Sequence, residues 1–88
     1  MKLVSIGELI KEGHLVPSGM SINELASKLS VSPSTLSRVI AGKSLLTVEM
    51  AIKLEGVWPR KAYTWLHHQL RYQLQENGYE LEGTNNED

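Results

Sequence analysis

The 88-residue sequence contains no cysteine, so neither a disulfide framework nor a thiolate metal site is available to it. It also has no apolar run close to the roughly 20 residues that a membrane-spanning helix needs. The segment after Met1 becomes polar too soon for a secretory signal peptide. These absences predict a cytoplasmic protein. The length fits one domain, and because so small a domain has little stability to spare, association with a partner would help it.

The net charge of the chain is −1, but acidic residues are absent from its centre, so the charge is unevenly distributed. Residues 1–75 hold all nine basic residues and five acidic ones, whereas residues 76–88 hold five acids and no base. No acid lies between Glu24 and Glu49. The bases in that segment are Lys28, Arg38 and Lys43. Because salt confines charge effects to about 8–10 Å, this locally positive segment suits nucleic acid.

The sequence also lacks the residue patterns expected of an enzyme or a metal site. His67 and His68 are adjacent, so on a helix their side chains diverge and do not bind one metal ion, and His14 is distant in sequence. No serine has a visible pairing with histidine and acid, and the scattered glutamates are more simply surface charge. We therefore expect no catalytic residue, no metal and no cofactor.

Start and stop signals divide the chain into five short helices. The expected caps of the first four are Ser5, Ser21, Ser32 and Thr47, and Pro33 stands at the first position of the third. The predicted helices span 6–13, 22–29, 33–41, 48–55 and 60–77, with 14–19 as a connector. No strand of usual length and no repeat is evident, so the predicted fold class is all-α.

Residues 22–41 have the pattern of two short helices joined by a three-residue turn, the helix-turn-helix unit. The apolar residues that share one face of each helix are Leu25, Leu29, Leu36, Val39 and Ile40. Val31 is the apolar residue of the turn, and Ala26 is small where the helices are expected to cross. Ser30 stands where glycine is usual, so it must accept a left-handed backbone or a slightly different turn, at a cost of about 1 kcal/mol.

The outer face of the second helix in such a unit enters the major groove of duplex DNA. Arg38 is the one side chain on this face able to contact guanine O6 and N7 with two bonds. Lys43, just past the helix, is placed for a backbone phosphate, and short hydroxyl side chains suit phosphate or water-mediated contacts. The predicted DNA-binding residues are Ser32, Pro33, Ser34, Thr35, Ser37, Arg38 and Lys43.

The last predicted helix is apolar over a wide arc. One stripe consists of Tyr63, Leu66, Leu70 and Leu74. A second stripe, roughly 160–180° away, contains Trp65 and Tyr72. A small core covers both stripes only if it wraps the helix. Because aromatic residues are enriched at interfaces, the second stripe predicts a homodimer interface formed by Trp65, Gln69 and Tyr72.

Short motifs occur along most of the chain: Gly7-Glu8, Pro17, Gly19-Met20-Ser21, Val31-Ser32, the run Ser34 to Arg38, Gly42-Lys43 and Glu49-Met50-Ala51. The most discriminating is Trp-Leu-x-x-Gln-x-x-Tyr-x-Leu, from Trp65 to Leu74. In these motifs the chain resembles the HigA group of XRE-type helix-turn-helix proteins, the antitoxins of HigB–HigA modules. The resemblance begins at Ile6. The departures are Val48, where proline is common, and Trp58-Pro59, where a Leu-Gly junction is usual.

The resemblance implies a five-helix, lambda-repressor-like (XRE/Cro-type) helix-turn-helix domain. We expect residues 1–78 to form this DNA-binding domain, including a C-terminal dimerisation helix, and residues 79–88 to form an acidic tail. The resemblance also implies a homodimer that binds a palindromic operator in double-stranded DNA and represses its own operon. It further implies binding and silencing of a HigB-type ribonuclease toxin.

Two other functions remain open from the sequence. One is a stand-alone or phage-type transcriptional regulator without a toxin partner. The other is a protein-interaction module that has lost DNA binding, which a serine-rich, weakly basic face would suit. The acidic tail either aids solubility or, through Tyr79 and Leu81, docks on a partner as a short extended segment. Strong salt dependence of DNA binding would separate the regulators from the interaction module.

Overall fold

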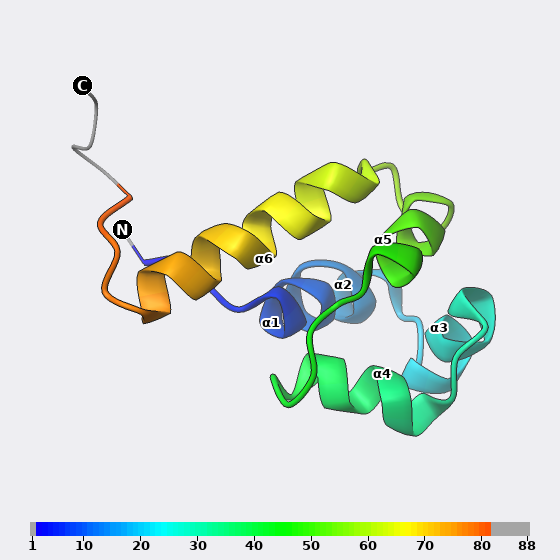
Figure 1. The fold of residues 1–88 in the computed structure, drawn as a ribbon. Helices are drawn as coiled ribbons and strands as arrows, with labels where there is room; N and C mark the ends of the chain where they lie inside the picture. The colour runs from blue at the N-terminus through cyan, green and yellow to red at the C-terminus, as the bar shows by residue number, and fades with distance from the viewer. Residues whose placement is uncertain (1, 82–88) are drawn as a thin grey trace.

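The computed structural model describes residues 2–81, and all regular structure in that range is helical. The first helix is continuous and consists of α1 (Ile6–Ile10), the π-helical turn η1 (Lys11–Leu15) and α2 (Val16–Ser18). The other helices are α3 (Ile22–Leu29), α4 (Pro33–Ile40), α5 (Val48–Glu55) and α6 (Ala62–Glu76) (Figure 1). The predicted all-α architecture of five helices is therefore confirmed. Most of the predicted acidic tail, 82–88, lies outside the described residues.

The first helix is longer than the sequence indicates, and the prediction that it ends near Gly13 is wrong. It continues through the expected connector and ends at Gly19, which has the left-handed φ of 72°. The π turn explains the continuation. Ile10 and Leu15 are both buried, and five residues at about 100° each would place them roughly 140° apart on an α-helix. The wider π turn returns Leu15 to the core.

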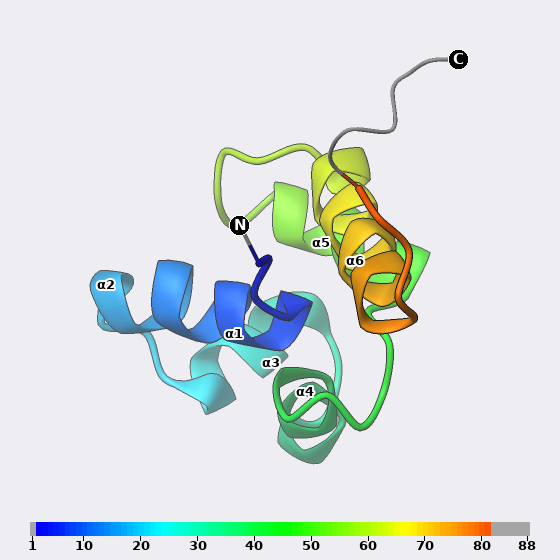
Figure 2. The same ribbon diagram turned by 90° about the vertical axis from the view of Figure 1, so that its left-hand side faces the viewer.

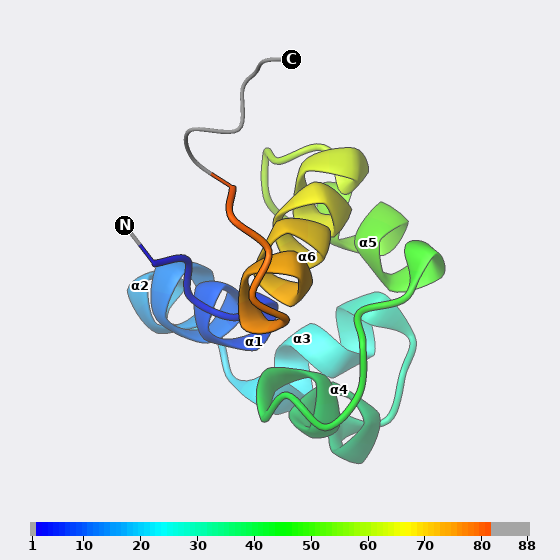
Figure 3. The ribbon, with the colours of Figure 1, turned by 60° about the vertical axis from the view of Figure 1, so that its left-hand side comes forward.

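The first helix lies between α6 on one side and α4 on the other, and it packs against both (Figures 2 and 3). The buried apolar core consists of Ile6, Ile10, Leu15, Leu25, Ala26, Leu29, Leu36, Val39, Leu46, Met50, Ala51, Leu54 and Trp65. Every helix contributes to it, so no helix pair is independent of the rest. Val31 packs against this core from the turn, as predicted.

Local hydrogen bonds explain why the helices begin and end where they do. Ser21 and Glu24 form a complete capping box, with two bonds of 3.0 Å. At the other end of α3, Ser30 has φ 57° and ψ 40°, so the expected left-handed backbone is present. The Val31 N–H donates to the Ala26 carbonyl at 3.0 Å, the long bond of a Schellman turn. This turn sets the direction in which α4 leaves α3.

Gly7 is the point of closest approach between α1 and α4. A Cβ atom placed on Gly7 would lie 2.2 Å from the carbonyl oxygen of Ile40. Backbone atoms do not yield as a flexible side chain does, so any larger residue must push the two helices apart. The glycine therefore fixes the distance between the first helix and the C-terminal end of α4.

We expect Gly7→Ala to lower the free energy of unfolding by about 1–3 kcal/mol, because the added methyl group overpacks the contact with Ile40. Urea denaturation measures this effect. Gly13→Ala is the matched control, because its Cβ would meet only the tip of the Leu9 side chain, at 3.3 Å. That change should leave stability unchanged or raise it by up to about 1 kcal/mol. Equal stabilities of the two variants would contradict the assignment.

Candidate nucleic-acid interface

Helix α4 lies at the periphery of the molecule (Figures 1 and 3). Its polar side chains, among them Ser34, Ser37 and Arg38, are exposed. Ser32 caps this helix by accepting a hydrogen bond of 3.1 Å from the Thr35 N–H. The same Oγ atom lies 2.9 Å from Thr35 Oγ1 and 3.2 Å from Ser34 Oγ. Three exposed hydroxyl groups therefore gather at the N-terminal end of α4, where the helix dipole also favours an anion such as a phosphate.

The other end of α4 presents the two basic side chains expected at the interface. Arg38 lies in the last turn and Lys43 in the loop that follows, and both are exposed. The loop reverses at Gly42, whose φ is 81°, so that the Lys43 N–H donates to the Arg38 carbonyl at 2.8 Å. The structure thus brings all seven predicted DNA-binding residues onto α4, its cap and this loop.

The guanidinium of Arg38 has a partner that the sequence did not reveal. Its Nε–H donates a hydrogen bond of 3.2 Å to the hydroxyl oxygen of Ser44. The Ser44 N–H in turn donates to the Arg38 carbonyl, also at 3.2 Å. The two residues are six apart, a spacing that places no pair together within one helix, so only the folded loop shows the contact.

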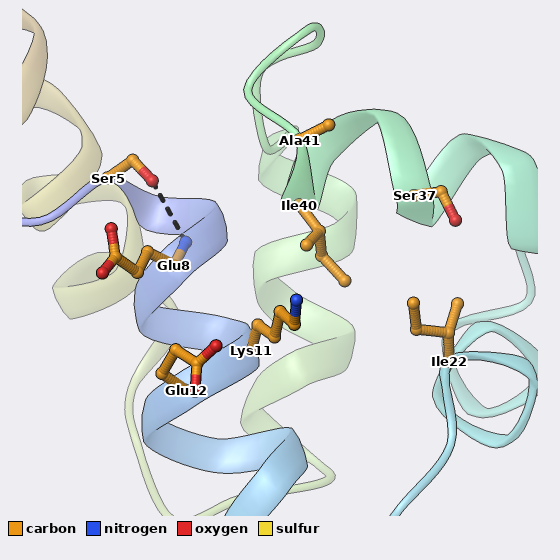
Figure 4. A pocket seen from close by; sticks show the side chains of 8 residues that line it. All are labelled: Ser5, Glu8, Lys11, Glu12, Ile22, Ser37, Ile40 and Ala41. Carbon is orange, nitrogen blue, oxygen red and sulfur yellow. Dashed lines mark hydrogen bonds between the residues drawn. The ribbon is translucent and has the colours of Figure 1, made fainter.

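A groove between α1 and α4 adds a second side to this surface (Figure 4). It is lined by Ser5, Glu8, Lys11, Glu12, Ile22, Ser37, Ile40 and Ala41. Figure 4 shows Lys11 extending from the first helix toward α4. The sequence did not indicate this lysine, because its proximity to α4 depends on how the two helices pack. Glu8 and Glu12 flank Lys11, so the groove contains both acidic and basic side chains. The basic side chains at the end of α4 are Arg38 and Lys43.

The side of α6 that was predicted to form a dimer interface faces the core instead. Trp65 is 0% exposed, so its side chain has no surface to offer a second copy. Its ring centroid lies 4.8 Å from that of His14 and 6.2 Å from that of Trp58, and the Arg60 guanidinium carbon is 4.8 Å from the ring. The prediction of Trp65 as an interface residue is therefore wrong, because it is buried against His14, Trp58 and Arg60 of the same chain.

Gln69, also predicted at the interface, is only 8% exposed and serves the inside of the molecule. Its Oε1 accepts from the Leu46 N–H at 2.8 Å, and its Nε2 donates to the Leu46 carbonyl at 3.0 Å. This pair satisfies two backbone groups in the loop before α5, and the interface prediction is corrected for this residue too. Tyr72 is half-buried, and it borders a small hollow between α1, the α4–α5 loop and α6.

The stripe that the sequence assigned to the core includes two strongly exposed residues. Tyr63 is 70% exposed and Leu70 is 52% exposed. Helix α5, which packs against α6, exposes further apolar side chains. We refer to the exposed large apolar side chains of α6, of α5 and of the loop before α5 as the α5–α6 apolar face: Leu45, Val48, Ile52, Tyr63 and Leu70. The apolar positions on α6 were therefore predicted with the correct spacing, but the side predicted to face a second copy, that of Trp65, faces the core.

Residues 2–81 contain neither a candidate metal site nor a candidate membrane-spanning helix. This part of the chain has no group of three or more histidine, aspartate or glutamate residues able to hold a metal ion. None of its helices is both long and apolar enough to cross a membrane.

The arrangement of α3, the Schellman turn and the exposed α4 defines a helix-turn-helix protein. The sequence matches the helix-turn-helix family model over residues 15–57. It is 37% identical over 73 residues to a helix-turn-helix type transcriptional regulator of Haemophilus influenzae, covering 83% of this chain and 68% of that protein. The chain belongs to the XRE-type helix-turn-helix family of DNA-binding transcriptional regulators.

Two further similarities place the chain close to antitoxins and operator-binding proteins. Antitoxin HigA-1 of Vibrio cholerae is 36% identical over 66 residues, covering 75% of this chain and 62% of the antitoxin. A Pseudomonas aeruginosa protein solved in complex with its operator DNA is 26% identical, with a TM-score of 0.80, covering 88% of this chain and 83% of that one. The resemblance to the HigA group seen in the sequence is thus confirmed.

The interior role of Gln69 predicts a stability effect. Gln69→Ala removes both partners of the Leu46 backbone, so we expect the free energy of unfolding to fall by about 1–3 kcal/mol. Thermal unfolding monitored by circular dichroism measures it. Gln73→Ala is the control, because Gln73 is exposed one turn later on the same helix and should change stability by less than about 0.5 kcal/mol. If the Gln69 variant were as stable as this control, the two bonds to Leu46 would contribute nothing.

Proposed function

We propose that this chain is an operator-binding repressor that acts as a homodimer and serves as a HigA-like antitoxin. The observation that carries the DNA-binding part is the surface of α4. A cap with three hydroxyl groups lies at one end of the helix, and an ordered arginine and a lysine lie at the other. All are exposed on α4, its cap or the loop that follows, so a duplex can reach them together.

The two ends of α4 have different tasks in this proposal. The hydroxyl groups of Ser32, Ser34 and Thr35 bind phosphate oxygens, which sets the position of the helix in the major groove. Arg38 reads a guanine through O6 and N7, and Lys43 neutralises a phosphate. Ser37 borders the groove between α1 and α4, on the exposed side of the reading helix, where a base edge or a water molecule can reach it.

We expect Arg38→Ala to weaken binding to the cognate operator by about 1–3 kcal/mol and to relax the preference at one base pair. Lys43→Ala should instead weaken binding to all sequences alike and reduce the salt slope by about one unit. Fluorescence anisotropy with operator and scrambled duplexes over a salt series measures both. Base reading by Arg38 would be disproved by an Arg38→Ala variant that keeps the full preference for the operator.

The homodimer in this proposal forms through the α5–α6 apolar face. Two-fold related helix-turn-helix units read half-sites about 34 Å apart, which requires a fixed arrangement of both reading helices. Solvent exposure of five large apolar side chains on α5, α6 and the loop before α5 favours their burial against a like surface. We assign this face to a second copy of the chain, because an operator with two half-sites requires two helix-turn-helix units. Tyr63 on this face is an aromatic residue, a type that is enriched at such interfaces.

We expect Leu70→Glu to convert the dimer into a monomer that keeps its helical content, because it places a charge among the apolar residues of this face. The dimer dissociation constant should rise about tenfold or more. Sedimentation velocity over a concentration series measures this constant, and operator binding should fall in parallel. The control is Val16→Glu, the same kind of change at an exposed apolar residue on α2. A Leu70→Glu variant that sediments as the wild type would rule out this face.

The antitoxin part of the proposal rests on the similarity to HigA-1 of Vibrio cholerae and on the Trp65 to Leu74 motif. It requires a ribonuclease partner of HigB type encoded beside the gene. We expect the two chains to copurify after co-expression and the ribonuclease to be inactive in the complex. A neighbouring gene of another class, or an active ribonuclease in the presence of this chain, would leave a stand-alone repressor.

A further inference from the structure

We propose that Ser44 is a positioning residue, which holds the guanidinium of Arg38 so that its outer edge reads guanine. This inference rests on the proposed operator binding and adds a residue to it. Neither the helix pattern nor the family motifs single out Ser44. Its role follows from three hydrogen bonds in the loop between α4 and α5.

All three bonds connect Arg38 with the two residues at the start of that loop. The Arg38 carbonyl accepts from the Lys43 N–H at 2.8 Å and from the Ser44 N–H at 3.2 Å. The Ser44 hydroxyl then accepts from the Arg38 Nε–H at 3.2 Å. Ser44 is thus tied to the main chain and to the side chain of one residue. The main-chain bonds keep its hydroxyl within reach of the guanidinium, so the side-chain bond closes a ring at little further entropic cost.

The loop that carries Ser44 is itself held at both ends. Gly42 reverses the chain with a φ of 81°, and its N–H donates to the Val39 carbonyl at 3.1 Å. Two residues beyond Ser44, both backbone groups of the buried Leu46 are bonded to the side chain of Gln69. A serine held between these two anchors has a defined place relative to α4, which a serine in a free loop would lack.

The bond to Ser44 selects one edge of the guanidinium for DNA. The Nε–H is engaged with Ser44, so the two terminal nitrogens remain for an acceptor pair. Guanine presents O6 and N7 as neighbouring acceptors in the major groove, and two parallel N–H donors match them. A free arginine loses the conformational freedom of a long side chain on binding, which lowers its affinity for the base. Ordering by Ser44 before binding removes part of that loss.

The first test uses the free protein and the Nε–H signal of Arg38 in nitrogen-15 NMR spectra. In the wild type we expect this proton to exchange with water more slowly than the Nε–H of a solvated arginine. Ser44→Ala should abolish the protection, and Ser44→Thr should restore it because threonine keeps the hydroxyl. Ser27→Ala, the same change at an exposed position on α3, should leave the signal unchanged. Equal exchange in the wild type and Ser44→Ala would overturn the proposal.

The second test measures discrimination between the operator and a duplex in which the guanine read by Arg38 is replaced. We expect Ser44→Ala to reduce this ratio by about two- to tenfold, the fold-change that corresponds to ordering one long side chain. The salt slope should not change, since no phosphate contact is lost. Ser44→Thr should recover the ratio. Circular dichroism confirms that both variants fold.

The outcomes separate this inference from the proposed function. If the wild-type chain binds no duplex selectively, operator binding is wrong and the role of Ser44 falls with it. If the wild type discriminates and Ser44→Ala discriminates equally well, operator binding stands and the positioning role alone is overturned. A loss of affinity that is equal on all duplexes would assign Ser44 to a phosphate contact and would also overturn the proposal.

Discussion

The contact between Gly7 and the carbonyl of Ile40 is the constraint on which the arrangement of the helices depends. With no side chain at Gly7, the first helix lies directly against the end of α4, and its other side packs on α6. The first helix therefore positions both α4 and α6, and α6 carries part of the α5–α6 apolar face. Under the proposed function, the first helix would therefore support both the DNA-binding surface and the dimer interface.

A second connection runs through polar atoms in the core. The amide of Gln69 bonds both backbone groups of Leu46, so α6 also holds the loop that carries Lys43 and Ser44. Hydrogen bonds inside a core are directional, so they fix this loop more narrowly than apolar contact alone would. Packing at Gly7 and hydrogen bonding at Gln69 thus both act at the C-terminal end of α4, the first on the helix and the second on the loop that follows it.

The sequence predicted the features that depend on near neighbours. Caps at Ser21, Ser32 and Thr47 act over three residues, so their signals are local and the helix starts were correct. The inward side of α6 was predicted wrongly because both of its sides are apolar. The choice depends on His14 and Trp58, which meet Trp65 only after folding. The bond from Arg38 to Ser44 was missed for a similar reason, since the intervening turn has to form first.

The π turn between Lys11 and Leu15 affects how the length of this chain can vary. A π turn holds one more residue than an α turn, so the first helix contains one residue beyond what a regular helix would need. Removal of that residue within η1 would leave an ordinary α-helix in which Ile10 and the following leucine still face the core. Removal nearer the start would rotate Gly7 by about 100° away from Ile40. Among relatives, deletions in this helix should therefore fall within the π turn.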